Sequence, residues 1–273
     1  MADLAVRVDG RLFAPSQIGS DPLLGHAQSL PLLTHNPWAV VAPDGGNING
    51  WYTNKYDISV ADPRIVTDAG APGGDTTIVE IAFNGLDNID ATPAKLWAVF
   101  AASKEVYCEW WIKVSANWAS DPAGAGKMHY LWPTAAVGGG NYYSGILCAG
   151  STFGTCASKT TTPLVVGMWI QWTGAAPDLQ PYGDFMRMPN VTTTTFLRNQ
   201  WVKVGFYTKQ ESNPGSSRDG IIRWWVNDIL NGNYPALSTP SADFNLFEFA
   251  PYKQDPVAQA EFMWIADTVI RGQ

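Results

Sequence analysis

Short runs of alternating apolar and polar residues make up most of the chain from Trp51 onward. They include TTIVEIAFNG, AKLWAVFAA, EVYCEWWIKVS, GKMHYLWP, LVVGMWIQWTG, WVKVGFYTKQ, GIIRWWVND, FNLFEFAP and EFMWIADTVI. Gly, Pro, Asn and Asp residues separate these runs, and apolar residues at helical spacing are almost absent. One run, Pro93–Ser103, fits either a strand or a short helix. The pattern predicts an all-β fold of many short strands joined by turns.

The alternation also predicts which side of each strand faces the core, because successive side chains of a strand point to opposite faces. In Val106–Val114 the even-numbered positions are apolar and the odd-numbered ones are aromatic or charged. Trp201–Lys209 and Gly220–Asn227 have the same parity. We therefore expect a two-sheet antiparallel sandwich with one shared core: Val106, Trp110, Ile112, Val204, Phe206, Ile222, Trp224 and Val226.

The first fifty residues differ from the rest of the chain. They are rich in Pro, Gly and Asn and contain one predicted hairpin, LAVRVDGRLF, which turns at Asp9-Gly10. Regularly spaced apolar residues are too few there for a separate core. We therefore expect an irregular N-terminal arm over residues 1–50 and one sandwich domain over residues 51–273. The arm is expected to pack on a neighbouring subunit or along the outside of the sandwich.

The charge of the chain excludes some classes of partner. The formal net charge is −7 and the isoelectric point is near 4.9, whereas binding to nucleic acid needs a basic face. No apolar run is long enough to span a membrane, so no membrane insertion is expected. The first residues, MADLAVRVDGRLFAP, do not form a signal peptide. Either the native start has been replaced, or the protein is made in the cytoplasm and acts without Sec export.

The cysteines and histidines do not have metal-site spacings. His26, His35 and His129 are scattered along the chain, and we expect no metal and no cofactor. Cys148 and Cys156 flank the segment AGSTFGT, which has the composition of a hairpin tip, and the sequence leaves open whether they form a disulfide. Cys108 alternates with apolar neighbours and is expected to be an inert core residue.

The order of several segments carries a resemblance to a known superfamily. They are KEVYCEWWIKVSANW, GKMHYLW, RNQWVKVGFYTKQESNPGSSRDGIIRWWVNDILNGNY and EFMWIADTVIRG. Together they resemble the concanavalin A-like lectin/glucanase jelly-roll superfamily, especially the polysaccharide-lyase-like domains of bacteria and phages, over roughly residues 75–271. This chain has Asn227-Asp228 at the second hairpin turn, where that family more often has Asp-Gly. The resemblance implies a jelly-roll domain over residues 51–273.

The resemblance also implies a place for a saccharide. In that superfamily the outer face of the concave sheet takes an extended sugar chain, whose rings stack on aromatic side chains while polar groups bind its hydroxyls. The aromatic and charged side chains on outer strand positions here supply this mixture, although a plain solvated sheet carries similar residues. The candidate binding residues are Glu109, Trp111, Gln171, Lys203, Tyr207, Arg223 and Trp225.

A catalytic alternative comes from two short similarities to alginate lyases. Lys127-Met128-His129 is similar to their Q-I-H strand, and the segment from Lys203 to Gln210 is similar to their K-A-G-x-Y-x-Q strand. By this resemblance His129 neutralises or deprotonates the substrate, Tyr207 is the general acid or base, and Lys203 and Arg223 hold the uronate carboxylate. The third motif of those enzymes, R-x-E-L-R, is absent here, as is the glucanase strand E-x-D-x-x-E.

Two functions follow as hypotheses. The first is a non-catalytic, lectin-like carbohydrate-binding surface protein, a phage virion component such as a decoration, tail or adhesin protein. Its partners are then a polysaccharide or cell-surface glycan, together with further copies of itself or other virion proteins. It is expected on a virion or an extracellular surface. The alternative is a polysaccharide lyase that cleaves a uronate-containing polymer by β-elimination.

Overall fold

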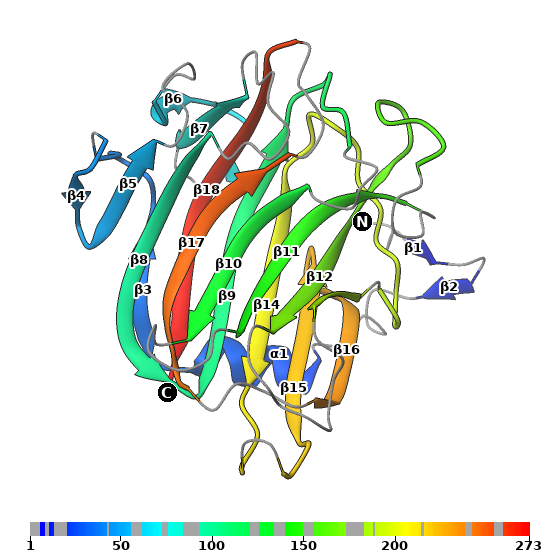
Figure 1. Ribbon diagram of the computed structural model, residues 1–273. Coiled ribbons are helices and arrows are strands. Elements are labelled where there is room, and N and C mark those ends of the chain that lie inside the picture. Colours follow the sequence, from blue (N-terminus) through cyan, green and yellow to red (C-terminus); the bar gives the residue numbers. More distant parts are fainter. Residues whose placement is uncertain are drawn as a thin grey trace, which may run out of the picture.

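The chain is an antiparallel two-sheet sandwich (Figure 1). The computed structural model describes residues 6–8, 11–13, 21–42, 44–55, 62–72, 76–83, 93–120, 126–133, 140–149, 156–172, 183–187, 189–213, 216–237, 242–253 and 259–273. The predicted jelly-roll sandwich is confirmed. In the described part of the chain, no helix has the length and apolar character needed to cross a membrane.

The sheet that we call the front sheet has its strands in the order β13 (Gly183–Arg187), β12 (Leu164–Trp172), β11 (Gly140–Cys148), β10 (Lys127–Pro133), β17 (Phe244–Tyr252), β8 (Ala94–Ser103), β5 (Trp51–Lys55) and β4 (Asn47–Ile48). The back sheet has the order β16 (Ile229–Leu237), β15 (Gly220–Val226), β14 (Val202–Lys209), β9 (Glu105–Val114), β18 (Glu261–Gly272), β7 (Thr77–Phe83) and β6 (Arg64–Thr67). Strand β3 (Leu32–Asn36) also pairs with β18.

The core lies between the two sheets, and the predicted parity of the strands is correct. All eight residues of the expected core set are buried in one cluster, with exposed fractions of 0–1%. The ring of Trp224 lies so close to β16 that a Cβ atom on Gly232 would be 2.0 Å from it. Glycine is therefore required at position 232, since a side chain there would overlap the indole.

The ambiguous run Pro93–Ser103 forms strand β8. Leu96 and Ala98 face the core, while Lys95 and Trp97 are half-buried on the opposite side. The strand is held on both edges, by β5 and by β17. These two ladders satisfy its backbone groups, so the tertiary pairing decides in favour of the strand.

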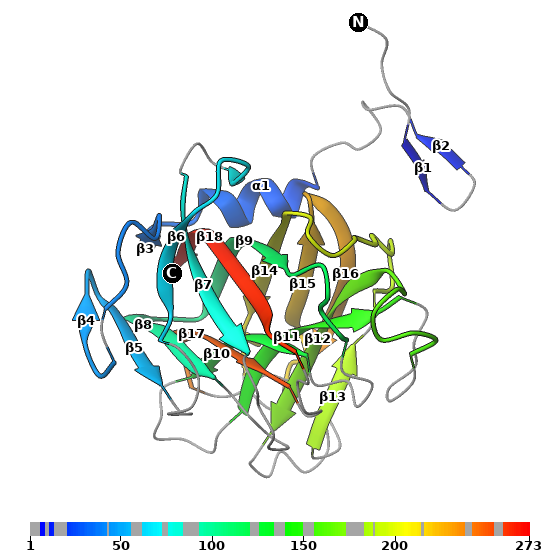
Figure 2. The same ribbon diagram turned by 90° about the horizontal axis from the view of Figure 1, so that it is seen from above.

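The N-terminal arm contains more regular structure than expected. The hairpin forms between β1 (Val6–Val8) and β2 (Arg11–Phe13), and its predicted turn lies outside the described residues. Residues 22–29 form helix α1 (Pro22–Ser29). The Asp21 carboxylate accepts a hydrogen bond from the Leu23 amide at 3.0 Å, which caps the first turn. The helix packs along the outside of the back sheet (Figure 2).

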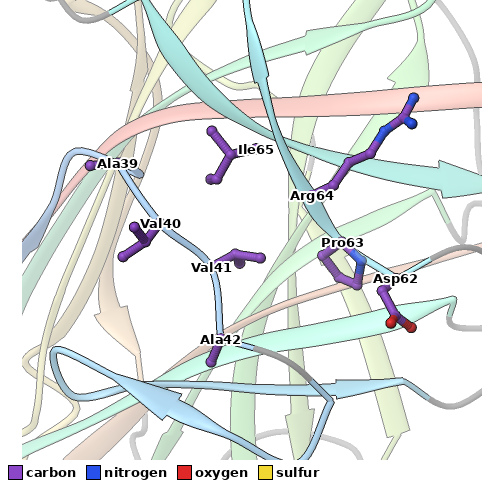
Figure 3. A pocket seen from close by; sticks show the side chains of 8 residues that line it. All are labelled: Ala39, Val40, Val41, Ala42, Asp62, Pro63, Arg64 and Ile65. Carbon is purple, nitrogen blue, oxygen red and sulfur yellow. The ribbon is translucent and has the colours of Figure 1, made fainter.

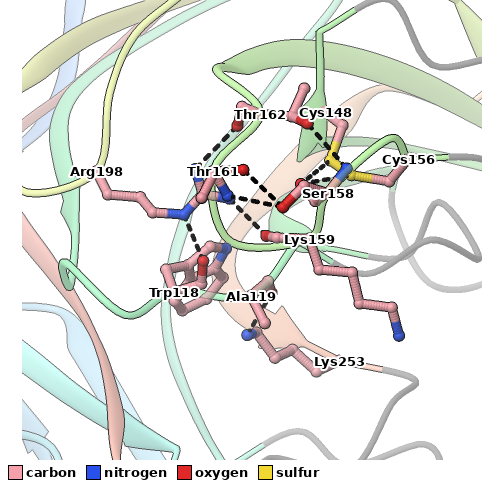
Figure 4. Close-up of a disulfide and its surroundings, with 10 residues drawn as sticks. All are labelled: Trp118, Ala119, Cys148, Cys156, Ser158, Lys159, Thr161, Thr162, Arg198 and Lys253. Carbon is pink, nitrogen blue, oxygen red and sulfur yellow. Dashed lines mark hydrogen bonds between the residues drawn. A yellow bond between two sulfur atoms is a disulfide. The ribbon is translucent and has the colours of Figure 1, made fainter.

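Cys148 and Cys156 form a disulfide beside a half-buried arginine, Arg198 (Figure 4). The Arg198 guanidinium donates hydrogen bonds to the carbonyl oxygens of Lys159 and Thr162, at 2.6 and 2.9 Å, and to that of Trp118. The disulfide and the arginine together fix the segment that follows Cys156 against the sandwich. The remaining cysteine, Cys108, is buried in the core, which raises the pKa of its thiol.

Candidate functional site

The residues predicted for saccharide binding fall on two different sheets. Six of them lie on one outer face of the back sheet, on strands β9, β14 and β15: Glu109, Trp111, Lys203, Tyr207, Arg223 and Trp225. Lys203 pairs with Trp111, and Tyr207 pairs with Arg223. Gln171 lies on β12 of the front sheet and is separate from the rest. Six of the seven candidate residues therefore lie on three adjacent strands of one sheet.

Helix α1 covers much of this back-sheet face, so Tyr207 and Trp225 are not available to a polymer. Both side chains are only 1% exposed. They form a small second core with Tyr107 and with Leu24 and Ala27 of the helix. Their expected role in saccharide contact is therefore corrected to a structural one, because the sheet uses these rings to hold the helix.

Polar groups of the same face are also engaged, by the residue that caps the helix and by the first residue of β9. The Tyr207 hydroxyl donates to Glu105 at 2.6 Å, and burial raises the pKa of this tyrosine. The Trp225 indole donates to Asp21 at 3.2 Å, and the Arg223 guanidinium lies 3.5 Å from the same carboxylate. The two contacts of Asp21 tie the beginning of α1 to β15.

The charged residues near the other end of α1 are paired in the same way. Glu109 accepts hydrogen bonds from the Tyr107 hydroxyl at 2.6 Å and from Gln28 at 3.2 Å. The Lys203 ammonium is 2.7 Å from Asp228 and 6.0 Å from the centre of the Trp111 ring. Trp111 remains half-buried beside this cluster. The back-sheet face is therefore mainly a docking surface for the chain's own helix.

The predicted lyase residues do not form one site. His129 is fully buried between the sheets, in ring contact with Trp110, Phe206 and Phe247 at 4.5 to 5.2 Å. Burial lowers the pKa of its imidazole to about 3. Lys203, Tyr207 and Arg223 lie on the outer face of the back sheet, so the sheet itself stands between them and the histidine. This catalytic assignment is therefore wrong.

A β-bulge in β10 explains the position of His129. The pairing of β10 with both β11 and β17 shifts between Lys127 and His129. As a result Met128 and His129 are both buried in the core, whereas Lys127 and Tyr130 are both half-buried on the outer side. Bulges re-aim side chains in this way and are frequent next to functional sites. The bulge places Lys127 on the outer face of the front sheet.

This outer face carries a row of aromatic residues that crosses the strands. Tyr52 pairs with Trp97, Trp97 with Glu248, and Glu248 with Tyr130. The rings of Tyr52 and Trp97 are stacked with centres 5.3 Å apart, and Tyr130 is stacked on Trp132 at 5.5 Å. We call this surface the aromatic face; its described residues are Tyr52, Trp97, Tyr130, Trp132 and Tyr252.

The pairing of the strands extends the same row beyond Tyr130. The backbone register places Tyr143 of β11 opposite Tyr130, and Trp169 of β12 opposite Tyr143. At these register positions the chain therefore has an aromatic residue on β5, β8, β10, β11 and β12, and Glu248 on β17.

Two lysines and one carboxylate lie among these rings. The Lys127 ammonium is 4.9 Å from the ring centre of Tyr252 and 5.8 Å from that of Tyr130. The Lys95 ammonium is 3.6 Å from Glu248. Rings that stack on sugars, beside cations that attract carboxylates, suit an extended polysaccharide. Among the described residues, no three His, Cys, Asp or Glu side chains are grouped to hold a metal ion.

An apolar hollow elsewhere on the surface lacks such chemistry (Figure 3). Its volume is about 510 Å³, and its lining residues are Ala39, Val40, Val41, Ala42, Asp62, Pro63, Arg64 and Ile65. Asp62 and Arg64 are the charged groups of this lining, and no aromatic ring belongs to it. The aromatic face is the better candidate site.

The sequence carried a signal for the aromatic face that the prediction did not use. Lys95 and Trp97 alternate with core residues in β8, as the predicted outer residues do in β9. The segment GKMHYLW also contains Tyr130 and Trp132 at alternate positions. The prediction applied the parity rule to three strands, all of which lie in the back sheet.

The fold is similar to several solved lyase structures. One is a variant of alginate lyase Aly36B in complex with alginate trisaccharide, with a TM-score of 0.61 and 12% identity over 90% of this chain and 100% of that one. Another is the endo-β-1,4-glucuronan lyase of the fungus Trichoderma reesei, with a TM-score of 0.52 and 11% identity over 84% of this chain and 94% of that one.

A third is alginate lyase vAL-1 from Chlorella virus, with a TM-score of 0.50 and 11% identity over 82% of this chain and 93% of that one. No protein-family model matches the sequence, and comparison with curated proteins finds no match. The predicted resemblance to jelly rolls of the polysaccharide-lyase kind is confirmed for the fold.

Proposed function

We propose that the protein binds an extended polysaccharide across the aromatic face of the front sheet. The observation that carries this proposal is the row formed by Tyr52, Trp97 and Tyr130, which crosses four neighbouring strands. Tyr52 is 38% exposed, and Trp97 and Tyr130 are half-buried, so their rings reach the surface. The similar fold of an alginate lyase that holds an alginate trisaccharide supports the proposal.

The expected affinity follows from the number of rings. A stacked aromatic contact contributes about 1 kcal/mol beyond the burial of its area, and association itself costs several kcal/mol. A few such rings give dissociation constants in the micromolar to millimolar range. Weak binding of this kind is consistent with a surface protein that meets a polymer carrying many copies of the same sugar.

Replacement of Trp97 by alanine tests this proposal. We expect Trp97→Ala to weaken binding to alginate oligosaccharides by about tenfold, since it removes a central ring of the row. Isothermal titration calorimetry measures the change. Trp111→Ala is the matched control, because Trp111 is also half-buried but lies on the back sheet. Equal losses in the two variants, or a loss only in Trp111→Ala, would contradict the proposal.

Lys127 favours a second function on the same face, the β-elimination of a uronate polymer. This reaction needs a base to remove the proton next to the carboxylate, a cation to stabilise the resulting charge, and an acid to protonate the leaving oxygen. The Lys127 ammonium lies near the rings of Tyr130 and Tyr252, which carry phenolic hydroxyls. In this proposal Lys127, in its neutral amine form, removes the proton next to the carboxylate, and one of the two tyrosines donates a proton to the leaving oxygen.

The ultraviolet absorbance of the unsaturated product distinguishes cleavage from binding alone. If the protein is a lyase, alginate or glucuronan gives rising absorbance with the wild type, and Lys127→Ala reduces the rate by at least about a hundredfold. Trp97→Ala then raises KM more than it lowers kcat. Binding without any absorbance change on either polymer would favour the non-catalytic function.

A place on a virion or another extracellular surface is a further proposal. The disulfide between Cys148 and Cys156 supports it, because such bonds persist mainly in oxidising surroundings. Gel filtration and negative-stain microscopy of the purified protein test for self-association. Gold-labelled antibodies on particles from a lysate test for a virion location, and particles without label would contradict it.

A further inference from the structure

A carboxylate lies beneath the middle of the aromatic face. Glu248 of β17 pairs with Trp97 on one side and with Tyr130 on the other, and it is only 6% exposed. Its Oε1 accepts a hydrogen bond from the Trp132 indole at 2.8 Å, and its Oε2 is 3.6 Å from the Lys95 ammonium. One buried side chain therefore contacts both an aromatic ring and a cation of the face.

Packing alone does not account for a carboxylate at this position. Removing a charged carboxylate from water is costly, and an ion pair at a buried site often contributes less stability than apolar residues of similar volume. Burial raises the pKa of Glu248, in the direction that this cost predicts. A buried charge that is retained against such a cost is a candidate for a functional role.

Lys95 and Glu248 differ in how far their side chains are exposed to solvent. The Lys95 side chain is 26% exposed and the Glu248 side chain is 7% exposed, so the cation is the partner that reaches the surface. The Trp132 ring is held from below by Glu248 and is stacked on Tyr130 at an interplanar angle of 14°. The carboxylate thus lies under the groups that a ligand would touch.

We propose that Glu248 is a positioning residue of the aromatic face, which fixes the Lys95 ammonium and the Trp132 ring in the orientation that receives an acidic polysaccharide. This inference rests on the proposed binding function. Glu248 itself does not need to touch the ligand, since it acts through the two side chains that it holds.

The back sheet offers a matched control. Glu80 of β7 is 8% exposed, accepts a hydrogen bond from the Trp264 indole at 2.9 Å, and is paired with Arg64 at 2.7 Å. It therefore makes the same kind of contacts as Glu248, on the outer face of the opposite sheet. Replacing Glu80 reports the structural cost of losing such a carboxylate without touching the aromatic face.

A double-mutant cycle on the affinity for alginate hexasaccharide tests the proposal. We expect Glu248→Gln and Lys95→Met each to weaken binding by about tenfold, which corresponds to a hydrogen bond or ion pair with a charged group. The double variant is expected to lose no more than about tenfold, because both changes remove the same positioned cation. Glu80→Gln is expected to change the affinity by less than about twofold, whatever it does to the melting temperature.

A third variant addresses the aromatic part of the proposal. Glu248→Gln keeps an oxygen that can accept from Trp132, whereas Glu248→Leu removes it. We therefore expect the leucine variant to bind more weakly than the glutamine variant and to shift the tryptophan fluorescence. If the leucine variant does not fold, the glutamine variant and its cycle with Lys95→Met still decide the question.

The outcomes separate this inference from the proposed function. Losses that multiply to about a hundredfold in the double variant, or a loss in Glu80→Gln equal to that in Glu248→Gln, would overturn the positioning role. Tighter binding in Glu248→Gln would also overturn it, since the carboxylate would then be masking Lys95. If Trp97→Ala weakens binding while no Glu248 variant does, only this inference fails. If the wild type binds no hexasaccharide, the binding function fails first.

Discussion

At the residue scale, His129 shows how burial decides the role of a titratable group. Its Nδ1 atom is hydrogen-bonded to the Ser144 hydroxyl, and no described residue is a partner for its Nε2 atom. The pKa of the imidazole falls to about 3 because burial disfavours the charged form. The residue that resembled a catalytic histidine is therefore a neutral core residue.

This burial predicts a loss of stability in acid. The unfolded chain protonates His129 near its ordinary pKa of 6.5, whereas the folded chain protonates it only near 3. Between these values the unfolded state binds more protons, so the free energy of unfolding decreases as the pH is lowered. Urea titrations between pH 7.5 and 4 measure the slope. His129→Leu is expected to have a shallower slope, and an unchanged slope would contradict the assignment.

At the element scale, helix α1 and the bulge in β10 determine which outer residues are available. The helix covers Tyr207 and Trp225 on the back sheet, and the bulge places Lys127 on the front sheet. Both elements are short. Asp21 and Pro22 are ordinary signals for the start of a helix, but the eight residues of the helix contain a glycine and only two buried side chains. A β-bulge has no comparable signature in one sequence.

The helix predicts opposite results for two tryptophans. Trp225→Ala is expected to lower the free energy of unfolding by about 3–5 kcal/mol, because it empties a buried site beneath α1. Its effect on polysaccharide binding should be small. Trp97→Ala is expected to weaken polysaccharide binding and to change the free energy of unfolding only slightly. Chemical denaturation combined with calorimetric binding measures both properties, and unchanged stability in Trp225→Ala would mean that the helix does not cover this ring.

At the scale of the whole molecule, the aromatic face exists because strands that are distant in sequence become neighbours. Tyr52, Trp97, Glu248 and Tyr130 come from β5, β8, β17 and β10, and each pair of neighbours is set by a separate ladder. Neighbouring strands are about 4.8 Å apart, so the row from Tyr52 to Tyr130 extends over about 14 Å.

The length of this row predicts a dependence on ligand length. Alginate oligosaccharides that are too short to reach from Tyr52 to Tyr130 are expected to bind more weakly than a hexasaccharide, because they contact fewer rings. The affinity should then become constant once both ends of the row are occupied. Calorimetry on a series from disaccharide to octasaccharide measures this. Equal affinity for all lengths would place the site on one or two rings only.

The sequence by itself determined the fold class and the composition of the core. Alternation is a local property: each residue's parity within its own strand fixes its face, so Trp110, Phe206 and Trp224 are identified as core residues without knowledge of their neighbours. The resemblance in segment order was likewise sufficient for the jelly-roll sandwich. Parity also predicted that Trp111, Lys203 and Arg223 point away from the core.

Only the tertiary structure decided which outer face is open. Tyr207 and Trp225 are covered because α1 packs on them. Lys127 faces outward because the β-bulge inserts one extra residue into β10. The row on the front sheet depends on the order of the strands, which joins positions far apart in the chain. Such long-range pairing leaves little trace in the local pattern of residues, because the same alternation suits a covered face and an exposed one.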